Sequence, residues 1–360
     1  MAAVIFIVLF LAAPGWAQER SWEKRWQETL AAARKEGKVV IEGPADPQVR
    51  QELPEKFSAR FGVSVDYIGG RGSETVARVQ VERRARQYTR DVWLSGVGTF
   101  ATALYPEKML DPLGPELILP EVVDPSKWKN GKLWFMDPEE RYVLRLLNYR
   151  PPLFNVNTQL VNPKEIKSIG DVLNPKWRGK ISIVDPTVGG SGPYYAAVLW
   201  HQFGEEFVKR LYVDQRPFLS RDTRQLAESL ARGTHAISFG AGSEDMKRLQ
   251  AEGLPVMRIY SVPDASGVVT AGNGAVGFMN RAPNPNAARL FINWLASKEG
   301  VELYSRTRQL ATLRNDVDES FIATEELPPS GLKYFDAASW EFQLEGTEKT
   351  RMRMRELLKR

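Results

Sequence analysis

The side chains best suited to chemistry in this chain lie in three short loops, each of which follows an apolar, strand-like run. All three loops combine glycine with hydroxyl groups, and they are Gly69–Ser73, Asp185–Gly192 and Gly240–Ser243. Glycine lets the backbone approach a ligand closely, and free N–H groups at a helix start favour an anion. Ser73 and Ser191 precede predicted helices, and Arg71 offers paired donors to a carboxylate or phosphonate. These patterns predict binding of an anionic group.

The two serines have a second interpretation, because serine is also a favoured residue at helix N-termini. Ser73 or Ser191 could simply accept a hydrogen bond from the first turn of its own helix. Both interpretations stay open for each serine taken alone. Two such loops together favour a ligand cleft, since ligands of open α/β sheets bind outside the carboxyl ends of the strands.

Patterns that would indicate catalysis are incomplete. Gly70–Thr75 lacks the third glycine of a dinucleotide fingerprint, and no Gly-Lys-Ser/Thr triplet marks a phosphate-binding loop. In Gly189–Pro193 a proline stands where the nucleophile elbow of a hydrolase needs its last glycine. His201 and His235 lie in no catalytic or metal-binding spacing, so we interpret both as structural or surface residues. We therefore expect no enzyme activity, no cofactor and no bound metal.

The composition is that of a globular protein. A length of 360 residues predicts about two domains, and 43% hydrophobic with 26% charged residues is ordinary for a folded chain. The absence of cysteine excludes disulfides, thiolate catalysis and iron–sulfur clusters. The net charge is +5, but glutamates interrupt the basic segments 78–90 and 349–360, where aromatics are scarce. We expect solvated helix faces there and no nucleic acid partner, although a positive field favours anionic solutes.

The N-terminus has the pattern of a cleaved export signal. Val4–Ala13 is an apolar run too short to span a bilayer, and the small residues Gly15 and Ala17 have the spacing that an export peptidase requires. The first three residues depart from the pattern, because none of them is basic. We expect cleavage near Ala17 and a periplasmic location, with a short membrane anchor as the alternative.

Strand-like and helix-like segments then alternate with short connections, which predicts parallel sheets covered by helices. The predicted helices are Ser21–Glu36, Val49–Phe61, Glu74–Tyr88, Pro193–Phe203, Arg224–Ala231 and Asn286–Ala296. The predicted strands are Val39–Ile41, Val63–Ile68, Asp91–Leu94, Tyr142–Tyr149, Ile181–Val184, Ala236–Phe239 and Val268–Met279.

The order of motifs in Phe154–Ser191 resembles the second lobe of periplasmic solute-binding proteins of the ferric-ion-binding type, which serve ABC importers. Asn157-Thr158 follows an apolar run, Pro175–Lys180 follows Asp171–Leu173, and a strand runs into Asp185-Pro186. Three further segments are similar to parts of that family, namely Gly72–Val79, Arg90–Ser95 and Asn284–Lys298.

The resemblance implies an α/β fold of the type II periplasmic binding protein class, with two lobes, a central ligand cleft and two interlobe crossings. It places the signal peptide at 1–17, the first lobe at 18–140 plus 265–312, and the second lobe at 141–264 plus 313–360. The crossings would lie near Tyr142–Tyr149 and Val262–Gly267.

The resemblance does not carry over the family's ferric ligands. Its ferric members bind iron through a tyrosine pair after the strand that corresponds to Ala236–Phe239, and here Gly240–Ser243 stands there. The pair Tyr194-Tyr195 falls in a predicted helix instead. Because bare ferric iron needs hard anionic oxygen ligands, the sequence favours an organic anion, with ferric iron or a ferric complex as the alternative.

The resemblance also implies the site and the partners. The expected ligand-binding residues are Glu42, Arg71, Gly72, Ser73, Ser95, Tyr142, Thr187, Ser191, Gly242 and Ser243. The expected partners are the solute and the ABC permease with its ATPase at the inner membrane, and the receptor would be a monomer. A sensor subunit that docks a receptor kinase has the same sequence signature. An enzyme on this fold, the porphyrin-pathway deaminase, needs a cysteine that this chain lacks.

Overall fold

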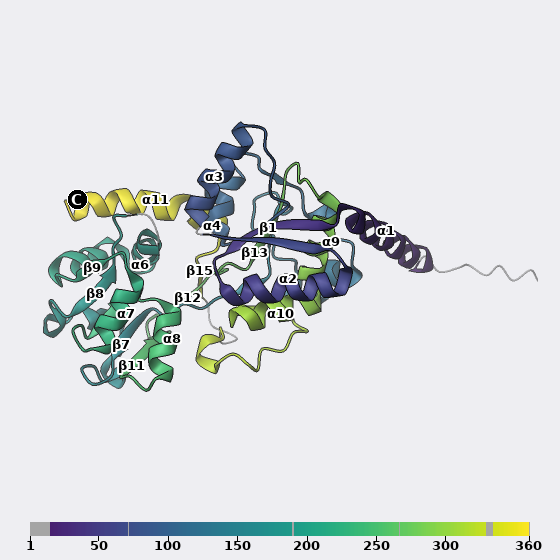
Figure 1. The fold of residues 1–360 in the computed structure, drawn as a ribbon. Coiled ribbons are helices and arrows are strands. Elements are labelled where there is room, and N and C mark those ends of the chain that lie inside the picture. Colours follow the sequence, from purple (N-terminus) through teal and green to yellow (C-terminus); the bar gives the residue numbers. More distant parts are fainter. Residues whose placement is uncertain (1–14, 71, 189–190, 266, 329–333, 360) are drawn as a thin grey trace, which may run out of the picture.

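Two α/β lobes make up the part of the chain that the computed structural model describes, which is residues 15–70, 72–188, 191–265, 267–328 and 334–359 (Figure 1). Each lobe contains one sheet with helices on both faces. The expected two-lobed α/β fold is therefore confirmed. Arg71 and the apolar run of the predicted signal peptide lie outside the described residues.

The first sheet has the strand order β2-β1-β3-β13-β4, and β5 also pairs with β13. Its strands are β1 (Lys38–Pro44), β2 (Ser64–Gly70), β3 (Val92–Ser95), β4 (Leu110–Asp111), β5 (Val143–Arg145) and β13 (Ala275–Met279). β1 runs parallel to β2 and β3, whereas β13 is antiparallel to β3 and β5. The chain therefore returns to this sheet after leaving it.

Side chains of β3 alternate between two cores, as a central strand requires. Val92 and Leu94 pack against α1, α2, α9 and α10, whereas Trp93 packs against α3 and α4. The helices of this lobe are α1 (Gly15–Glu36), α2 (Pro47–Phe61), α3 (Gly72–Arg84), α4 (Val97–Thr99), α5 (Pro120–Val123), α9 (Pro285–Ala296) and α10 (Lys298–Arg308). Helix α3 ends earlier than predicted, because Arg86 adopts a left-handed φ of 58°.

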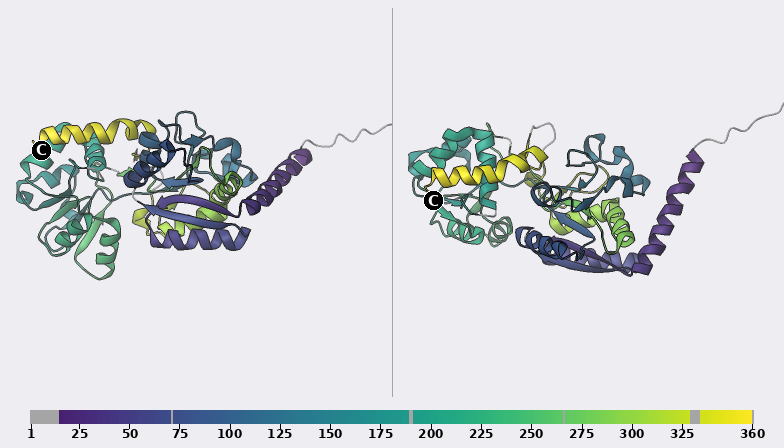
Figure 2. Two further views of the ribbon diagram at one scale, coloured as in Figure 1. Left: turned by 45° about the horizontal axis from the view of Figure 1, so that its top comes forward. Right: turned by 90° about the horizontal axis from the view of Figure 1, so that it is seen from above.

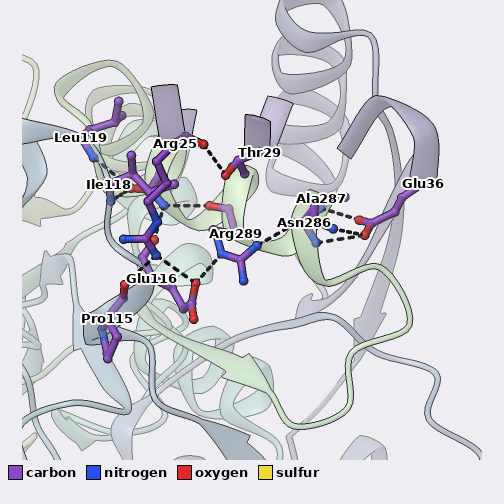
Figure 3. A network of polar contacts seen from close by, with 11 residues as sticks. Arg25, Thr29, Glu36, Pro115, Glu116, Ile118, Leu119, Asn286, Ala287 and Arg289 are labelled. Carbon is purple, nitrogen blue, oxygen red and sulfur yellow. Dashed lines mark hydrogen bonds and ion pairs between the residues drawn. The ribbon is translucent and has the colours of Figure 1, made fainter. Parts of the chain in front are cut away.

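Helix α1 projects from the first lobe and is held there by side chains between Arg25 and Glu36 (Figures 1, 2 and 3). Glu36 accepts hydrogen bonds from the backbone N–H groups of Asn286 and Ala287, which are free at the start of α9. Glu116 binds Arg25 of α1 and Arg289 of α9. Cleavage near Ala17 would leave all these contacts in place. No helix within the described ranges has the length and apolar composition needed to cross a bilayer.

The second sheet has the order β11-β7-β10-β8-β9. Its strands are β7 (Phe154–Asn157), β8 (Ile181–Val184), β9 (Phe218–Ser220), β10 (Ile237–Phe239) and β11 (Val256–Ile259). Its helices are α6 (Ser191–Lys209), α7 (Thr223–Ala231), α8 (Ser243–Ala251) and the C-terminal α11 (Trp340–Leu357). Gly204 breaks the helical geometry of α6 with a φ of 80°, at the position where the sequence predicts a helix end.

Three segments connect the lobes. The backbones of Tyr149 and Thr270 exchange two hydrogen bonds of 2.7 and 2.8 Å, which pairs the first connection with the second. The third connection runs from the first core, which includes Leu313 and Val317, to β15 (Phe335–Asp336). β15 pairs with β12 (Val268–Val269), and β6 (Leu147–Asn148) pairs with β14 (Ala311–Thr312).

These cores divide the chain slightly differently from the boundaries expected at residues 140 and 312. β5 still belongs to the first sheet, and Leu313 and Val317 still pack in the first core. The division into lobes at single-residue precision stays a prediction.

Helix α11 belongs to both lobes. Trp340 packs in the core beside α4, whereas Phe342 and Met354 pack in the core beside α6. Figure 1 shows α11 lying along α6 with its first turns next to α4. The C-terminal helix therefore bridges the two halves of the molecule.

Candidate functional site

The predicted binding residues lie mainly at one edge of each sheet. β1, β2 and β3 are parallel and end together at one edge of the first sheet, as β8, β9 and β10 do in the second. β5 ends at this edge of the first sheet, and β7 begins at this edge of the second. Because the chain runs from β5 through the short strand β6 into β7, the two carboxyl edges adjoin the same crossing. A solute held by both lobes would contact these edges.

A helix follows each of these parallel strands, and three of these helices begin at or beside predicted site residues. α3 starts two residues after β2, α6 starts at Ser191 after β8, and α8 starts at Ser243 after β10. The first turn of α6 contains no acidic residue, whereas the first turn of α8 contains Glu244 and Asp245. An anion is therefore better accommodated at the start of α6 than at the start of α8.

The start of α3 carries two further predicted residues. Gly72 is the first residue of α3, and Ser73 lies inside its first turn, because the helix begins two residues earlier than the sequence predicts. The neighbouring Thr75 is buried. The roles of Arg71, Gly72 and Ser73 as ligand-binding residues stay predictions.

Glu42 lies at the carboxyl end of β1 and is only 1% exposed. Its Oε2 accepts hydrogen bonds from Arg90 Nε at 2.8 Å and from Arg78 Nη2 at 3.3 Å. Burial raises the pKa of Glu42, although both arginines act in the opposite direction. Oε1 has no hydrogen-bond partner among the described residues. Glu42 is thus an ion-paired residue with one oxygen still able to accept a hydrogen bond.

Ser95 and Tyr142 are both engaged within the first lobe. Ser95, the last residue of β3, donates from Oγ to Thr99 Oγ1 at 2.9 Å. The Tyr142 ring packs edge-on against Tyr105, with 5.5 Å between centroids, and Tyr105 in turn packs against Trp340 of α11. Tyr142 therefore belongs to an aromatic cluster under α11, and the structure records no contact between it and the other predicted site residues.

The backbone N–H, hydroxyl and carbonyl groups of Thr187 all form hydrogen bonds within the protein. Asp185 Oδ1 accepts from the Thr187 backbone N–H at 2.8 Å and from its hydroxyl at 2.7 Å. The carbonyl of Thr187 accepts from Arg355 Nε at 2.9 Å. The hydroxyl proton is therefore already used, whereas Ser191 on the same loop is exposed at the start of α6. Of these two residues, Ser191 is the one whose side chain faces solvent.

Ser243 is joined to a residue that the sequence does not single out for binding. Tyr149 Oη lies 2.6 Å from Ser243 Oγ, and either oxygen can be the donor. Gly242 precedes Ser243 as the N-cap of α8. Tyr149 was predicted only as the last residue of a crossing strand. No local pattern indicates the pairing, because the two residues are 94 positions apart.

Tyrosines gather on the second lobe near this contact. The rings of Tyr194 and Tyr195 in α6 pack edge-on with centroids 5.8 Å apart, and both phenols interact electrostatically with Tyr149. Burial raises the pKa of all three phenols. Neutral phenols donate hydrogen bonds, so this group suits an oxygen-rich ligand.

Metal ligands of the usual acidic and imidazole types do not cluster within the described ranges, where no three histidine, aspartate or glutamate side chains could hold one ion. After β10 the chain continues as Gly240-Ala241-Gly242, so the tyrosine pair of the ferric proteins is not present at that position. A metal site would therefore need the phenols of Tyr149, Tyr194 and Tyr195 or a ligand supplied by the solute.

Comparison with known proteins gives one family. A sequence model of the family described as bacterial extracellular solute-binding protein matches residues 39–307. An uncharacterized protein of Haemophilus influenzae (strain ATCC 51907 / DSM 11121 / KW20 / Rd) is 25% identical over 288 residues, which cover 76% of each chain.

Solved structures of periplasmic binding proteins have the same fold. Iron-bound HitA of Pseudomonas aeruginosa matches with a TM-score of 0.66 at 16% identity, over 89% of this chain and 99% of HitA. AfuA of Actinobacillus pleuropneumoniae, solved with fructose-6-phosphate, matches with a TM-score of 0.60 at 21% identity, over 88% of this chain and 96% of AfuA. At these identities the likeness establishes the type II fold and leaves the solute open.

Proposed function

The chain belongs to the family of bacterial extracellular solute-binding proteins, and from that premise we propose that its solute is a small organic anion held between the lobes. The family and the fold make the protein a solute receptor of an ABC importer. Binding proteins of this kind act outside the cytoplasmic membrane and deliver small ligands to a permease. The anionic character of the solute, the monomeric state and cleavage of a signal peptide belong to the proposal.

One observation carries the anionic solute, namely the start of α6 at the carboxyl edge of the second sheet. Ser191 is exposed there, the first turn contains no acidic side chain, and the helix runs unbroken up to Gly204. Free N–H groups and the helix dipole favour negative charge at such a position. The net charge of +5 adds a positive field, which also favours an anionic solute.

Receptors of this fold work by hinge motion, in which the lobes close around the solute. Here three connections and helix α11 join the lobes, so closure has to bend the segments near Tyr149, Thr270 and Phe335. Capture of the solute without any chemical change is the expected activity.

A thermal-shift screen of residues 18–360 tests the proposal. The probes are citrate, inorganic phosphate, fructose 6-phosphate, spermidine as a cation, and ferric citrate. A ligand at 100 times its dissociation constant stabilises the folded state by about 2.7 kcal/mol, so a true solute raises the melting temperature measurably. We expect a shift with at least one metal-free anion, and recovery of that anion unchanged. A shift with spermidine alone would contradict the anionic solute.

Ferric iron is the second candidate, and the group formed by Tyr149, Tyr194 and Tyr195 is the observation that favours it. Iron would have to displace phenol protons whose pKa is raised by burial. Titration with ferric citrate should then produce a tyrosinate-to-iron absorption band, which the Tyr149→Phe variant should weaken. An anion alone produces no such band.

A further inference from the structure

Four arginines are buried in the described part of the chain, and only one of them lacks a carboxylate partner. The three paired arginines are Arg90 with Glu42, Arg145 with Asp336, and Arg314 with Asp316 and Glu121. Arg150 is 4% exposed, and the structure records no ion pair for it.

Arg150 is held only by uncharged groups. Its Nη1 donates to the carbonyl of Glu325 at 2.7 Å, and its guanidinium carbon lies 5.3 Å from the ring centre of Tyr260 and 5.6 Å from that of Tyr334. Nε has no hydrogen-bond partner among the residues that the structure describes. A buried charge with such partners is unfavourable, because they do not replace the water that it has lost. A negatively charged partner would therefore stabilise this guanidinium.

The position of Arg150 is the reason to assign that group to the solute. Arg150 directly follows Tyr149, which contacts Ser243, and it precedes β7, which begins at the carboxyl edge of the second sheet. Tyr260 follows the end of β11 at that same edge. The unpaired guanidinium therefore lies where the first crossing enters the second lobe, beside the predicted solute-binding edge.

The residue next to Nε is a glycine, which has no side chain of its own to contact the guanidinium. Gly267 has a φ of 100°, and a Cβ placed on it would lie 3.8 Å from Arg150 Nε and 2.6 Å from the carbonyl oxygen of Tyr260. A side chain at residue 267 is thus excluded by the Tyr260 backbone. Hinge opening of the lobes would give a solute its path to this side of the guanidinium.

We propose that Arg150 is the residue that binds the negatively charged group of the solute, a carboxylate or a phosphate ester, between the rings of Tyr260 and Tyr334. The inference rests on the proposed function and adds the residue that recognises the charge. Nε donates to an oxygen of the anion, and the planar guanidinium keeps its two tyrosine neighbours and its bond to Glu325. The two phenol rings then favour an organic solute with a flat or apolar portion next to its charged group.

Calorimetric titration of three matched proteins tests the proposal. They are the wild-type chain, Arg150→Gln, and Arg178→Gln as a control at an exposed arginine of the same lobe. The probes are citrate, inorganic phosphate and fructose 6-phosphate. We expect the wild type to bind at least one probe, Arg150→Gln to bind it about 10- to 100-fold more weakly, and Arg178→Gln to match the wild type.

The outcomes separate the two proposals. Equal affinity of the wild type and Arg150→Gln overturns the role of Arg150 and leaves the anion receptor standing. If no metal-free anion binds the wild type, the anionic solute and the role of Arg150 both fall.

A second measurement without ligand distinguishes recognition from a structural role. Arg145→Gln leaves Asp336 without its partner and should lower the melting temperature clearly. Arg150→Gln leaves no carboxylate unpaired and removes a buried charge, so its melting temperature should change much less. A loss as large as that of Arg145→Gln would show that Arg150 mainly holds the third connection in place, and it would overturn the proposal.

Discussion

The phenolic oxygen of Tyr149 lies 2.6 Å from Oγ of Ser243, and this contact joins the first interlobe connection to the first residue of α8. Tyr149 also exchanges backbone hydrogen bonds with Thr270 of the second connection. Tyr149 therefore links both paired connections to the second lobe, through its backbone and its side chain. Burial raises the pKa of Tyr149 while its bond to Ser243 acts in the opposite direction, so the phenol stays neutral at physiological pH.

Tyr149→Phe should lower the free energy of unfolding by about 0.5–1.5 kcal/mol, because it removes one hydrogen bond and leaves the Ser243 hydroxyl without that partner. Ser243→Ala should have a similar effect. The double variant should lose less than the sum of the two, since both changes remove the same interaction. Urea unfolding of the four proteins measures this coupling, and additive losses would show that the 2.6 Å contact contributes nothing to stability.

Arg355→Ala should loosen the loop that begins at Asp185. Arg355 Nε donates to the Thr187 carbonyl, which is the recorded contact from α11 to that loop. We expect faster amide hydrogen exchange in a peptide covering residues 185–188 and a loss of about 0.5–1.5 kcal/mol in stability. Lys349→Ala is the matched control, because Lys349 is an exposed cation of the same helix. Equal exchange in both variants would mean that α11 does not hold the loop.

Much of the sheet framework could be predicted from the sequence, because its elements have clear local patterns. β8 is a run of buried apolar residues between turn signals, and α9 has apolar side chains at helical spacing with Pro285 in its first turn. Gly204 marks the break in α6 as expected. In these elements the local sequence and the tertiary packing require the same structure.

The sequence does not reveal contacts between distant segments in the same way. The sequence predicts a solvated helix face at 349–360, yet Met354 within it is buried, and so are Trp340 and Phe342 earlier in the same helix. The partners of Arg150, like the contact of Tyr149 with Ser243, depend on three connections that meet only in the folded chain. Counting charges in a sequence cannot show which buried arginine lacks a carboxylate.

The hydrogen bonding of Thr187 to Asp185 does have a local signal in the sequence. Thr187 stands two residues after Asp185, and an aspartate commonly accepts hydrogen bonds from the residue two positions on. Both hydrogen bonds from Thr187 to Asp185 have this form. The turn Asp185-Pro186-Thr187 could therefore have been predicted to satisfy the threonine hydroxyl by itself.

Gly192→Ala should damage the start of α6 and any anion binding there. A Cβ on Gly192 would lie 1.9 Å from the carbonyl oxygen of Asp185, so the loop and the helix would have to move apart. We expect a loss of about 1–3 kcal/mol in urea unfolding, as for other overpacked sites. Gly170→Ala is the control, because its nearest neighbour would be the flexible Ser168 hydroxyl at 3.3 Å. Similar small losses in both variants would contradict the close approach at Gly192.

His235→Gln should remove part of the acid sensitivity of the fold. His235 is buried, its Nδ1 lies 3.0 Å from Ser229 Oγ, and its ring stacks on Phe218 with 5.3 Å between centroids. Burial lowers the pKa of His235 below its usual value of 6.5, so the folded state binds a proton less readily than the unfolded state. Its contribution to stability is therefore complete above pH 6.5 and is lost as the pH falls through the folded pKa, by about 1.4 kcal/mol for each unit of difference. Urea unfolding of the wild type between pH 8 and about pH 5 should show this loss, and His235→Gln should show a smaller one. The same pH dependence in both proteins would mean that His235 is not responsible for it.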